Sequence, residues 1–410
     1  MNRPSRTAHP RKPRLLHVTT VPQTLRFLGG HVRHTQDRGM EVHALSSPGK
    51  TLDQFGEQRQ VAVHGVPMPR RITPLRDLGA LWRISQVMGR LRPDIVHGHT
   101  PKGGLLAMMG AWLCRVPVRI YHMYGLPLLT ARGPKRHVLR WAEKTACRLA
   151  TQVLCLSQSL RASALAEGLC PPHKIKVLLA GNIDGVEAEN VFNPARLPPA
   201  GRREVRLRLG IPPDALVAGF VGRIVRDKGL VELAQAWQVL REEFPALHLL
   251  VVGPFEPQDP IPVGVATLLR GDPRIHLGGM VQNRDMPALY LAMDLLVLPT
   301  YREGFGTVLL EAAAMELPAV ATRIPGCVDA VLDRETGTLV PVHDSQALAG
   351  AVRTYLRQPE LRRWHGRAGR RRVLDEFCPE PMHEALYQEY VRLLGDQSVP
   401  WERPRGVTGP

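Results

Sequence analysis

The sequence predicts an α/β protein with two doubly wound parallel-sheet domains. Short apolar runs, typical of buried strands, alternate with longer runs of helical periodicity. This alternation pauses near residue 180 and restarts near residue 216. The chain has 410 residues, which is more than one ordinary hydrophobic core organises. Length and pattern therefore both predict two domains.

In the first half, apolar runs predict strands and amphipathic runs predict helices. Strands are expected at 15–21, 41–47, 61–68, 94–100, 117–125 and 151–158. Helices are expected at 26–39, 80–93, 103–116 and 133–150. Gly39 and Pro93 are typical helix terminators, because glycine adopts positive φ easily and proline lacks a backbone N–H.

The second half repeats the pattern after a linker that is rich in glycine, asparagine, proline and arginine. Strands are expected at 216–222, 247–253, 274–279, 295–299 and 318–322, and a long final helix at 380–395. The resulting domain prediction has five parts. These are a disordered basic arm (1–13), an N-terminal domain (14–185), a C-terminal domain (186–378), a C-terminal helix (379–396) and a disordered tail (397–410).

The charge of the chain implies an anionic partner. The formal net charge is +17, and such a charge favours nucleic acid, an anionic lipid surface or a phosphorylated substrate. The high arginine content fits the base composition of a GC-rich genome equally well. Aromatic residues make up only 5% of the chain and no nucleic-acid motif is present, so nucleic acid is not expected.

The six cysteines show no CxxC pair and no metal-ligand spacing, which favours free thiols in a reducing compartment. No signal peptide and no transmembrane helix are expected.

The most informative segment is EGFGTVLLE, in which Glu303 and Glu311 enclose a glycine-punctuated loop. An apolar run precedes the loop and a helical run begins at Thr307. Such strand–loop–helix units present backbone N–H groups to anions, so Gly304, Phe305, Gly306 and Thr307 are candidates for phosphate and sugar contacts. The side chain of Phe305 fits the domain core equally well.

A second strand–loop–helix unit, GFVGRIVRDKG, carries Arg223 and Lys228. Two cations on one loop fit a diphosphate, which they can neutralise without a metal ion. The alternative for Arg223 is a surface salt bridge. No Asp-x-Asp motif for a divalent metal is present, so no metal and no other cofactor are expected.

These motifs resemble the retaining, metal-independent glycosyltransferases of family 4, in the branch that builds bacterial surface polysaccharide and O-antigen. FVGR-x5-G with Lys228, the E-x7-E pair, and the phrases DLLVLPTYREGFGTVLLEAAAMELPAVAT and DIVHGHTPKGGLLAMMGAWLCRVPVRIYH carry the resemblance. It implies the GT-B architecture, with two Rossmann-like domains facing a cleft and a C-terminal helix that crosses back. By the same resemblance, Glu311 binds the ribose of a nucleotide sugar and Glu303 contacts the transferred sugar.

For the first half, the resemblance places Gly29 and Gly30 beside the donor phosphate, although helix glycines also serve packing. His97, His99 and Lys102 follow a strand end and are candidates for acceptor contacts. A hydrogen-bonded structural role fits the histidines equally well.

One position departs from the family. Where its members have a catalytic histidine before a glycine, this chain has Tyr124. His122 lies two residues earlier, on the same face of a strand. Three readings stay open: Tyr124 replaces the histidine, His122 performs its role, or the activity is altered.

The resemblance implies transfer of a hexose or N-acetylhexosamine from a nucleotide sugar, with a UDP-sugar expected, to a polyprenyl-diphosphate-linked glycan. The basic segment 133–150 is expected to bind an anionic membrane surface, which implies a cytoplasmic protein at the inner face of the membrane. A solvated surface helix is the alternative for this segment. Rival functions are a nucleotide-sugar epimerase, a transferase with a soluble acceptor, and a charge-driven binder of nucleic acid or lipid.

Overall fold

The computed structural model describes residues 11–69, 73–198, 200–257 and 259–397, and its contacts divide the chain into two units. The first unit contains the chain up to residue 156, residues 164–179, and the chain from residue 380 onward. The second unit contains residues 157–163 and 180–379. Each unit has its own parallel sheet, so the prediction of two doubly wound α/β domains is confirmed.

The first unit is built on a seven-stranded sheet in the order β3-β2-β1-β4-β5-β6-β7. Its strands are β1 (Arg14–Val18), β2 (Glu41–Ser46), β3 (Ala62–Gly65), β4 (Ile95–His99), β5 (Val118–Met123), β6 (Gln152–Cys155) and β7 (Ile175–Lys176). The strand order reverses direction between β1 and β4. Ligands bind open α/β sheets at such a switch point, outside the carboxyl ends of the strands.

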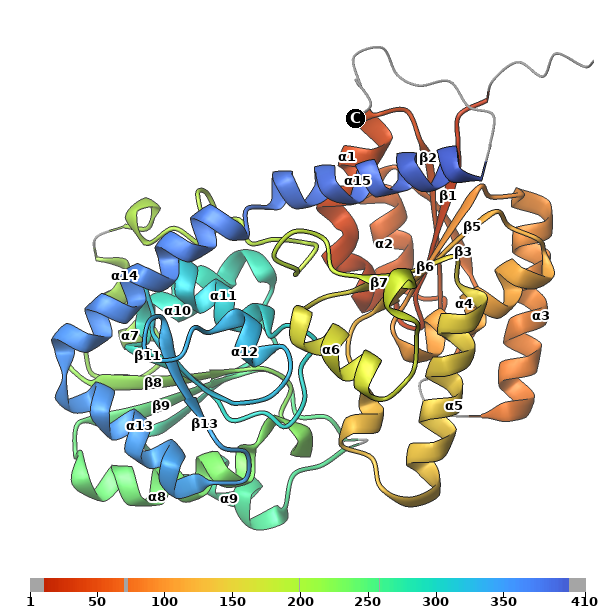
Figure 1. The fold of residues 1–410 in the computed structure, drawn as a ribbon. Coiled ribbons are helices and arrows are strands. Elements are labelled where there is room, and N and C mark those ends of the chain that lie inside the picture. The colour runs from red at the N-terminus through yellow and green to blue at the C-terminus, as the bar shows by residue number, and fades with distance from the viewer. Residues whose placement is uncertain (1–10, 70–72, 199, 258, 398–410) are drawn as a thin grey trace, which may run out of the picture. The chain divides into compact units, whose positions relative to one another are not determined.

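Helices cover both faces of this sheet (Figure 1). They are η1 (Pro22–Leu28), α1 (Gly29–Asp37), α2 (Lys50–Arg59), α3 (Pro74–Leu91), α4 (Pro101–Leu113), η2 (Pro127–Leu129), α5 (Gly133–Leu149), η3 (Pro172–Lys174) and α15 (Pro379–Asp396). Helix α6 (Gln158–Ala166) is divided between the two units, with its first six residues in the second. The helix predicted at 26–39 is thus a 3-10 turn followed by a shorter α-helix. Most of α15 belongs to the first unit, because Tyr390 bonds to His97 and Glu384 bonds to His34. The predicted return of the C-terminal helix is therefore confirmed.

The predicted disordered arm is wrong for residues 11–13. The Arg11 guanidinium donates two hydrogen bonds to the Asp94 carboxylate, at 2.8 and 2.9 Å. The Pro13 carbonyl accepts a hydrogen bond from the Glu41 N–H at 2.9 Å, which extends the pairing of β1 with β2. Residues 1–10 and the tail from 398 lie outside the described residues. The contact with Asp94, 83 positions away in sequence, is invisible to a reading of local composition.

The second unit contains a six-stranded sheet in the order β10-β9-β8-β11-β12-β13. Its strands are β8 (Leu216–Val221), β9 (Leu247–Val252), β10 (Ile275–Gly279), β11 (Leu295–Leu298), β12 (Ala319–Thr322) and β13 (Gly337–Val340). Its helices are η4 (Pro194–Arg196), α7 (Gly201–Arg208), η5 (Arg226–Lys228), α8 (Leu230–Glu243), α9 (Val263–Gly271), η6 (Asn283–Asp285), α10 (Met286–Ala292), α11 (Thr307–Ala314), α12 (Cys327–Ala330), α13 (Ser345–Arg357) and α14 (Pro359–Glu376). The switch point lies between β8 and β11, whose following loops carry Lys228 and Glu303.

Among the described residues, no helix is both long and apolar enough to span a bilayer. All six cysteines are free thiols.

A buried ion pair anchors α7 of the second unit. The Arg206 side chain is only 2% exposed, and its guanidinium lies 2.9 Å from the Asp294 carboxylate. The same carboxylate accepts a hydrogen bond from the Val217 N–H at 2.8 Å, which ties it to β8. The Arg206 guanidinium also donates to the carbonyls of Ala292 and Ala215. The buried positive charge of Arg206 is therefore surrounded by hydrogen-bond acceptors.

Asp294→Ala should destabilise the second unit by about 3–5 kcal/mol, because it leaves a buried guanidinium without its counter-charge. The free energy of unfolding in urea measures the change. Glu360→Ala is the matched control, since Glu360 and Arg363 form an exposed pair on α14, and its effect should stay within about 0.5 kcal/mol. Equal effects of the two substitutions would contradict the structural role of Asp294.

Candidate functional site

The loop after β11 has the strand–loop–helix form that its glycines predict. Gly306 adopts φ +78° and caps α11, a conformation that glycine reaches without strain. A Cβ on Gly326 would lie 2.9 Å from the carbonyl of Gly304, so the start of α12 packs against the loop backbone. The side chain of Phe305 is buried and its ring meets Phe377 edge-on at 5.4 Å. Phe305 therefore belongs to the core, and only its backbone is left for the predicted donor contact.

Glu311 lies one turn into α11, four residues after Thr307. The Tyr290 hydroxyl donates a hydrogen bond of 2.7 Å to its carboxylate. Burial raises the pKa of Glu311 to about 7, and the bond from Tyr290 opposes this rise. Burial and the neighbouring carboxylate raise the pKa of Tyr290 well above its usual range, so its hydroxyl stays protonated as a donor. The Glu311 carboxylate is therefore a half-buried hydrogen-bond acceptor, and the bond from Tyr290 fixes its orientation.

Both predicted phosphate cations form ion pairs with carboxylates. Lys228 binds Glu303, and both side chains are largely enclosed. The Arg223 guanidinium lies 2.9 Å from the Glu256 carboxylate, and its side chain is 50% exposed. Exposed ion pairs such as Arg223–Glu256 contribute little to the stability of the fold. An anionic ligand can therefore replace the Glu256 carboxylate at a small cost in free energy. The surface salt bridge weighed as the alternative for Arg223 is present, and the donor role of both cations stays a prediction.

The Lys228–Glu303 pair brings together two residues predicted independently from different loops. Gly229 follows Lys228 in the left-handed conformation, with φ +71°. A Cβ there would lie 1.9 Å from the Pro299 carbonyl, so the lysine loop needs glycine to approach the loop after β11. The geometry joins a cation, a carboxylate and the start of a helix at one sheet edge.

Sequence reasoning missed three residues at this edge: Tyr290, Glu256 and Asn182. The Thr307 hydroxyl donates to the Asn182 side-chain oxygen at 3.2 Å. Asn182 itself adopts φ +47°, which asparagine tolerates better than most residues. Asn182 lies in the segment interpreted as a linker. The Gly-Asn dipeptide there predicts a turn, but it does not show which side chain Asn182 would bind. Pairing with Thr307 depends on the fold.

In the first unit, four histidines lie on one face of neighbouring strands. His97 and His99 are two residues apart on β4, His17 pairs in register with His97, and His122 pairs in register with His99. All four are buried. The intervening Gly98 faces α4, where a Cβ would meet Ala107 at 2.7 Å. Strand alternation and register together therefore assemble a histidine cluster, defined here as His17, His97, His99 and His122.

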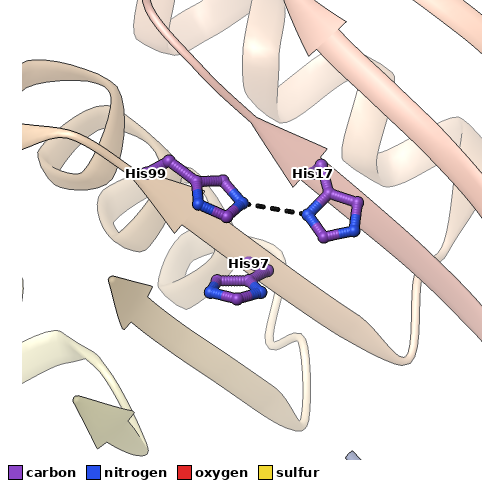
Figure 2. Close-up of side chains that lie close together, drawn as sticks. All are labelled: His17, His97 and His99. Atoms are coloured by element: carbon purple, nitrogen blue, oxygen red, sulfur yellow. Dashed lines mark hydrogen bonds between the residues drawn. The ribbon is translucent and has the colours of Figure 1, made fainter. Parts of the chain in front are cut away.

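Most hydrogen bonds of the histidine cluster are internal to the first unit. A hydrogen bond joins the rings of His17 and His99 (Figure 2), with Nδ1 of His17 2.9 Å from Nε2 of His99, and His97 Nδ1 lies 2.7 Å from the Tyr390 hydroxyl. Burial lowers the pKa of His17 and of His122 to about 3. Burial and the neighbouring imidazoles lower the pKa of His97 and His99 well below the usual range. The cluster is therefore neutral at physiological pH.

The remaining predicted residues of the first unit lie near this cluster or pack locally. The Tyr124 ring meets the rings of His122 and His99 edge-on, at 4.8 and 5.5 Å. Lys102 lies 2.6 Å from the Asp77 carboxylate. Gly29 and Gly30 form the start of α1, and a Cβ on Gly30 would lie 2.5 Å from the ring of His383. Close packing therefore explains why Gly29 and Gly30 have no side chain. The predicted ligand roles of the residues in this paragraph stay predictions.

The basic helix α5 exposes part of its charge. Two of its arginines, Arg136 and Arg140, bind Glu167 and its carbonyl. Trp141 is 64% exposed and Val138 is 49% exposed. The exposed cations of the helix are Lys135, Lys144 and Arg148. Trp141 and Val138 are therefore exposed on the same helix as these cations, and membrane binding by this helix stays a prediction.

Comparisons with known proteins match both units. A family model described as glycosyl transferases group 1 matches residues 201–372, and one described as a glycosyl transferase 4-like domain matches residues 26–181. The chain is 33% identical to the capsular polysaccharide biosynthesis glycosyltransferase CapM of Staphylococcus aureus over 381 residues, which are 93% of this chain and 97% of CapM.

Two further likenesses are more distant. The chain is 27% identical to an Escherichia coli UDP-Gal:alpha-D-GlcNAc-diphosphoundecaprenol alpha-1,3-galactosyltransferase, over 69% of this chain and 71% of that protein. The crystal structure of Anabaena Alr3699/HepE in complex with UDP-glucose is similar with a TM-score of 0.76 and 20% identity, covering 92% of this chain and 99% of that one. That level of identity supports the fold alone.

Proposed function

Because the chain belongs to the group 1 glycosyltransferases, we propose that it transfers a hexose or N-acetylhexosamine from a nucleotide sugar to a polyprenyl-diphosphate-linked glycan in surface polysaccharide synthesis. The relation to CapM supports the polysaccharide, and the E. coli relative, by its name, uses UDP-galactose and a diphosphoundecaprenol acceptor. A UDP-sugar is therefore the expected donor. The transfer is proposed to retain the anomeric configuration and to need no metal.

The observation that carries the donor site is the convergence of Lys228, Glu303 and the start of α11 at one sheet edge. As the glycosidic bond breaks, the nucleoside diphosphate gains negative charge, which fixed cations stabilise. The diphosphate replaces the carboxylate partners of Lys228 and Arg223. Glu303, released from Lys228, then accepts hydrogen bonds from hydroxyls of the transferred sugar.

Glu311 is assigned to the ribose. Its carboxylate is held by one hydrogen bond from Tyr290, which leaves further lone pairs for two hydroxyl donors. The half-buried position strengthens such bonds, because water competes less. The acceptor side is assigned to the first unit, with His122 and Tyr124 as candidates beside the transferred sugar.

Thermal stabilisation by nucleotides tests this proposal. A ligand at about 100 times its dissociation constant adds about 2.7 kcal/mol to the free energy of unfolding. UDP-, GDP-, dTDP- and ADP-sugars are compared with the bare nucleotides, in the wild type and in Glu311→Ala. We expect a shift with the uridine class that Glu311→Ala abolishes. No shift with any nucleotide would overturn the donor site, and conversion of the donor sugar without acceptor would indicate an epimerase.

Helix α5 is proposed to bind the anionic surface of a membrane. Lys135→Ala with Lys144→Ala should weaken binding to anionic vesicles roughly 30-fold, since each lysine near such a surface contributes about 1 kcal/mol. Co-sedimentation with phosphatidylglycerol and phosphatidylcholine vesicles measures the effect. Trp141→Ala should also weaken binding, whereas Trp364→Ala, which changes an exposed tryptophan of α14, should not. Binding that ignores lipid charge would contradict the proposal.

A further inference from the structure

Three histidines of the first unit converge as metal ligands do. One ring nitrogen from each of His17, His97 and His99 lies within 4.8 Å of the others, and all three side chains are buried (Figure 2). His97 and His99 project from the same face of β4, and His17 stands beside His97 on β1. Two histidines at alternate strand positions and one in register on the next strand form a triangle held by the sheet itself. We propose that this triangle binds a first-row divalent metal ion of the zinc class.

Part of the spacing already fits such an ion. Tetrahedral zinc with nitrogen ligands at about 2.0–2.1 Å needs these nitrogens about 3.4 Å apart. His17 Nδ1 and His99 Nε2 are already 2.9 Å apart, and the ring centroids of His17 lie 5.2 Å from His99 and 5.4 Å from His97. The widest separation of 4.8 Å must shrink by about 1.4 Å. Binding of the ion therefore requires a small rearrangement of the three side chains.

Two of the three ring nitrogens that would face away from the ion have the partner that a bound histidine requires, and the third, His99 Nδ1, has none among the described residues. A ligating histidine generally donates its other ring N–H to a nearby acceptor. When His97 ligates through Nε2, its Nδ1–H donates to the Tyr390 hydroxyl at 2.7 Å. When His17 ligates through Nδ1, its Nε2–H donates to His31 Nε2 at 3.2 Å. Both outer contacts are already present.

The hydrogen bonds of the cluster are incomplete without a ligand. Within the described residues, His97 Nε2 and His99 Nδ1 are buried without a hydrogen-bond partner, as are both ring nitrogens of His122. A metal ion uses the lone pair of His97 Nε2, which otherwise stays unpaired in a buried environment.

The chemistry of the three donors selects the ion. Three neutral imidazoles suit zinc and its first-row neighbours, whereas Mg²⁺ and Ca²⁺ prefer oxygen ligands. Ligands from β1 and β4 would brace the sheet at its switch point. This inference concerns only the first unit and does not depend on the proposed donor site. It competes with the predicted acceptor role of His97 and His99, because ligation occupies their ring nitrogens.

Cobalt substitution tests the proposal. The full chain is produced without an affinity tag from zinc-supplemented culture, and its zinc is counted by plasma mass spectrometry. Co²⁺ is then exchanged in and followed by the visible absorption of four-coordinate cobalt. We expect one ion per chain, an absorption band that Zn²⁺ abolishes, and a melting temperature that rises with bound metal.

Substitutions separate this site from adventitious binding. His99→Gln should weaken Co²⁺ binding by more than about 100-fold, and Tyr390→Phe, which removes only an outer partner, by about 10–100-fold. The matched control is His276→Gln in the second unit, where His276 pairs with His248 at a similar 2.9 Å, and it should change nothing. Far-ultraviolet circular dichroism checks that each variant folds. Absence of metal from the wild type, or equal binding by wild type and His99→Gln, overturns the proposal.

Discussion

Replacing Lys228 with alanine should lower the turnover number for sugar transfer by about 10²–10³-fold, the range typical for loss of one preorganised group that stabilises developing charge. Lys228 is enclosed at the end of β8 and its ammonium binds Glu303. Its charge acts where the leaving diphosphate becomes more negative, so the loss falls mainly on turnover. Initial rates with saturating donor and acceptor measure it.

Two controls sharpen this result. Arg226→Ala removes an exposed cation from the same turn, η5, and should leave the turnover number within about twofold of wild type, as expected for a solvent-screened surface charge. Omission of Mg²⁺ and Mn²⁺ should leave the wild-type rate unchanged, if the cations replace a metal. Equal losses in Arg226→Ala and Lys228→Ala would show that net loop charge matters and that Lys228 has no special position.

Donor affinity should rise about tenfold between pH 6 and pH 8, and this dependence should vanish in Glu311→Gln. Burial raises the pKa of Glu311 to about 7, so the group is largely protonated at pH 6 and ionised at pH 8. Ribose hydroxyls donate to the ionised carboxylate, so the bound state favours ionisation and affinity follows it upward with pH. Tyr290 stays neutral over this interval and contributes no titration of its own. Isothermal titration with a UDP-sugar at several pH values measures the effect.

The raised pKa of Glu311 makes the stability of the ligand-free protein fall with rising pH, whereas donor affinity rises. The folded-state pKa of Glu311 lies above the ordinary value of 4.5, so the folded state holds a proton that the unfolded state has released. The contribution of Glu311 to the free energy of unfolding is therefore complete below about pH 4.5 and is lost as the pH rises to about 7. Glu311→Gln should remove this slope, while Glu242→Gln, a change at an exposed carboxylate, should keep it. A pH-independent affinity for the UDP-sugar in the wild type would contradict the assignment of Glu311 to the ribose.

The sequence alone determined the two-domain α/β fold, because strand and helix periodicity and chain length are local or additive properties. It also located the loop from Glu303 to Thr307, since a strand, two glycines and a helix start are neighbours in sequence. Only the tertiary structure decided which side chains meet. Tyr290 reaches Glu311 because α10 and α11 pack on one face of the sheet, and Lys228 reaches Glu303 because β8 lies beside β11. The histidine triangle likewise depends on the register of β1 with β4, two strands some 80 residues apart, which alternation within one strand cannot reveal.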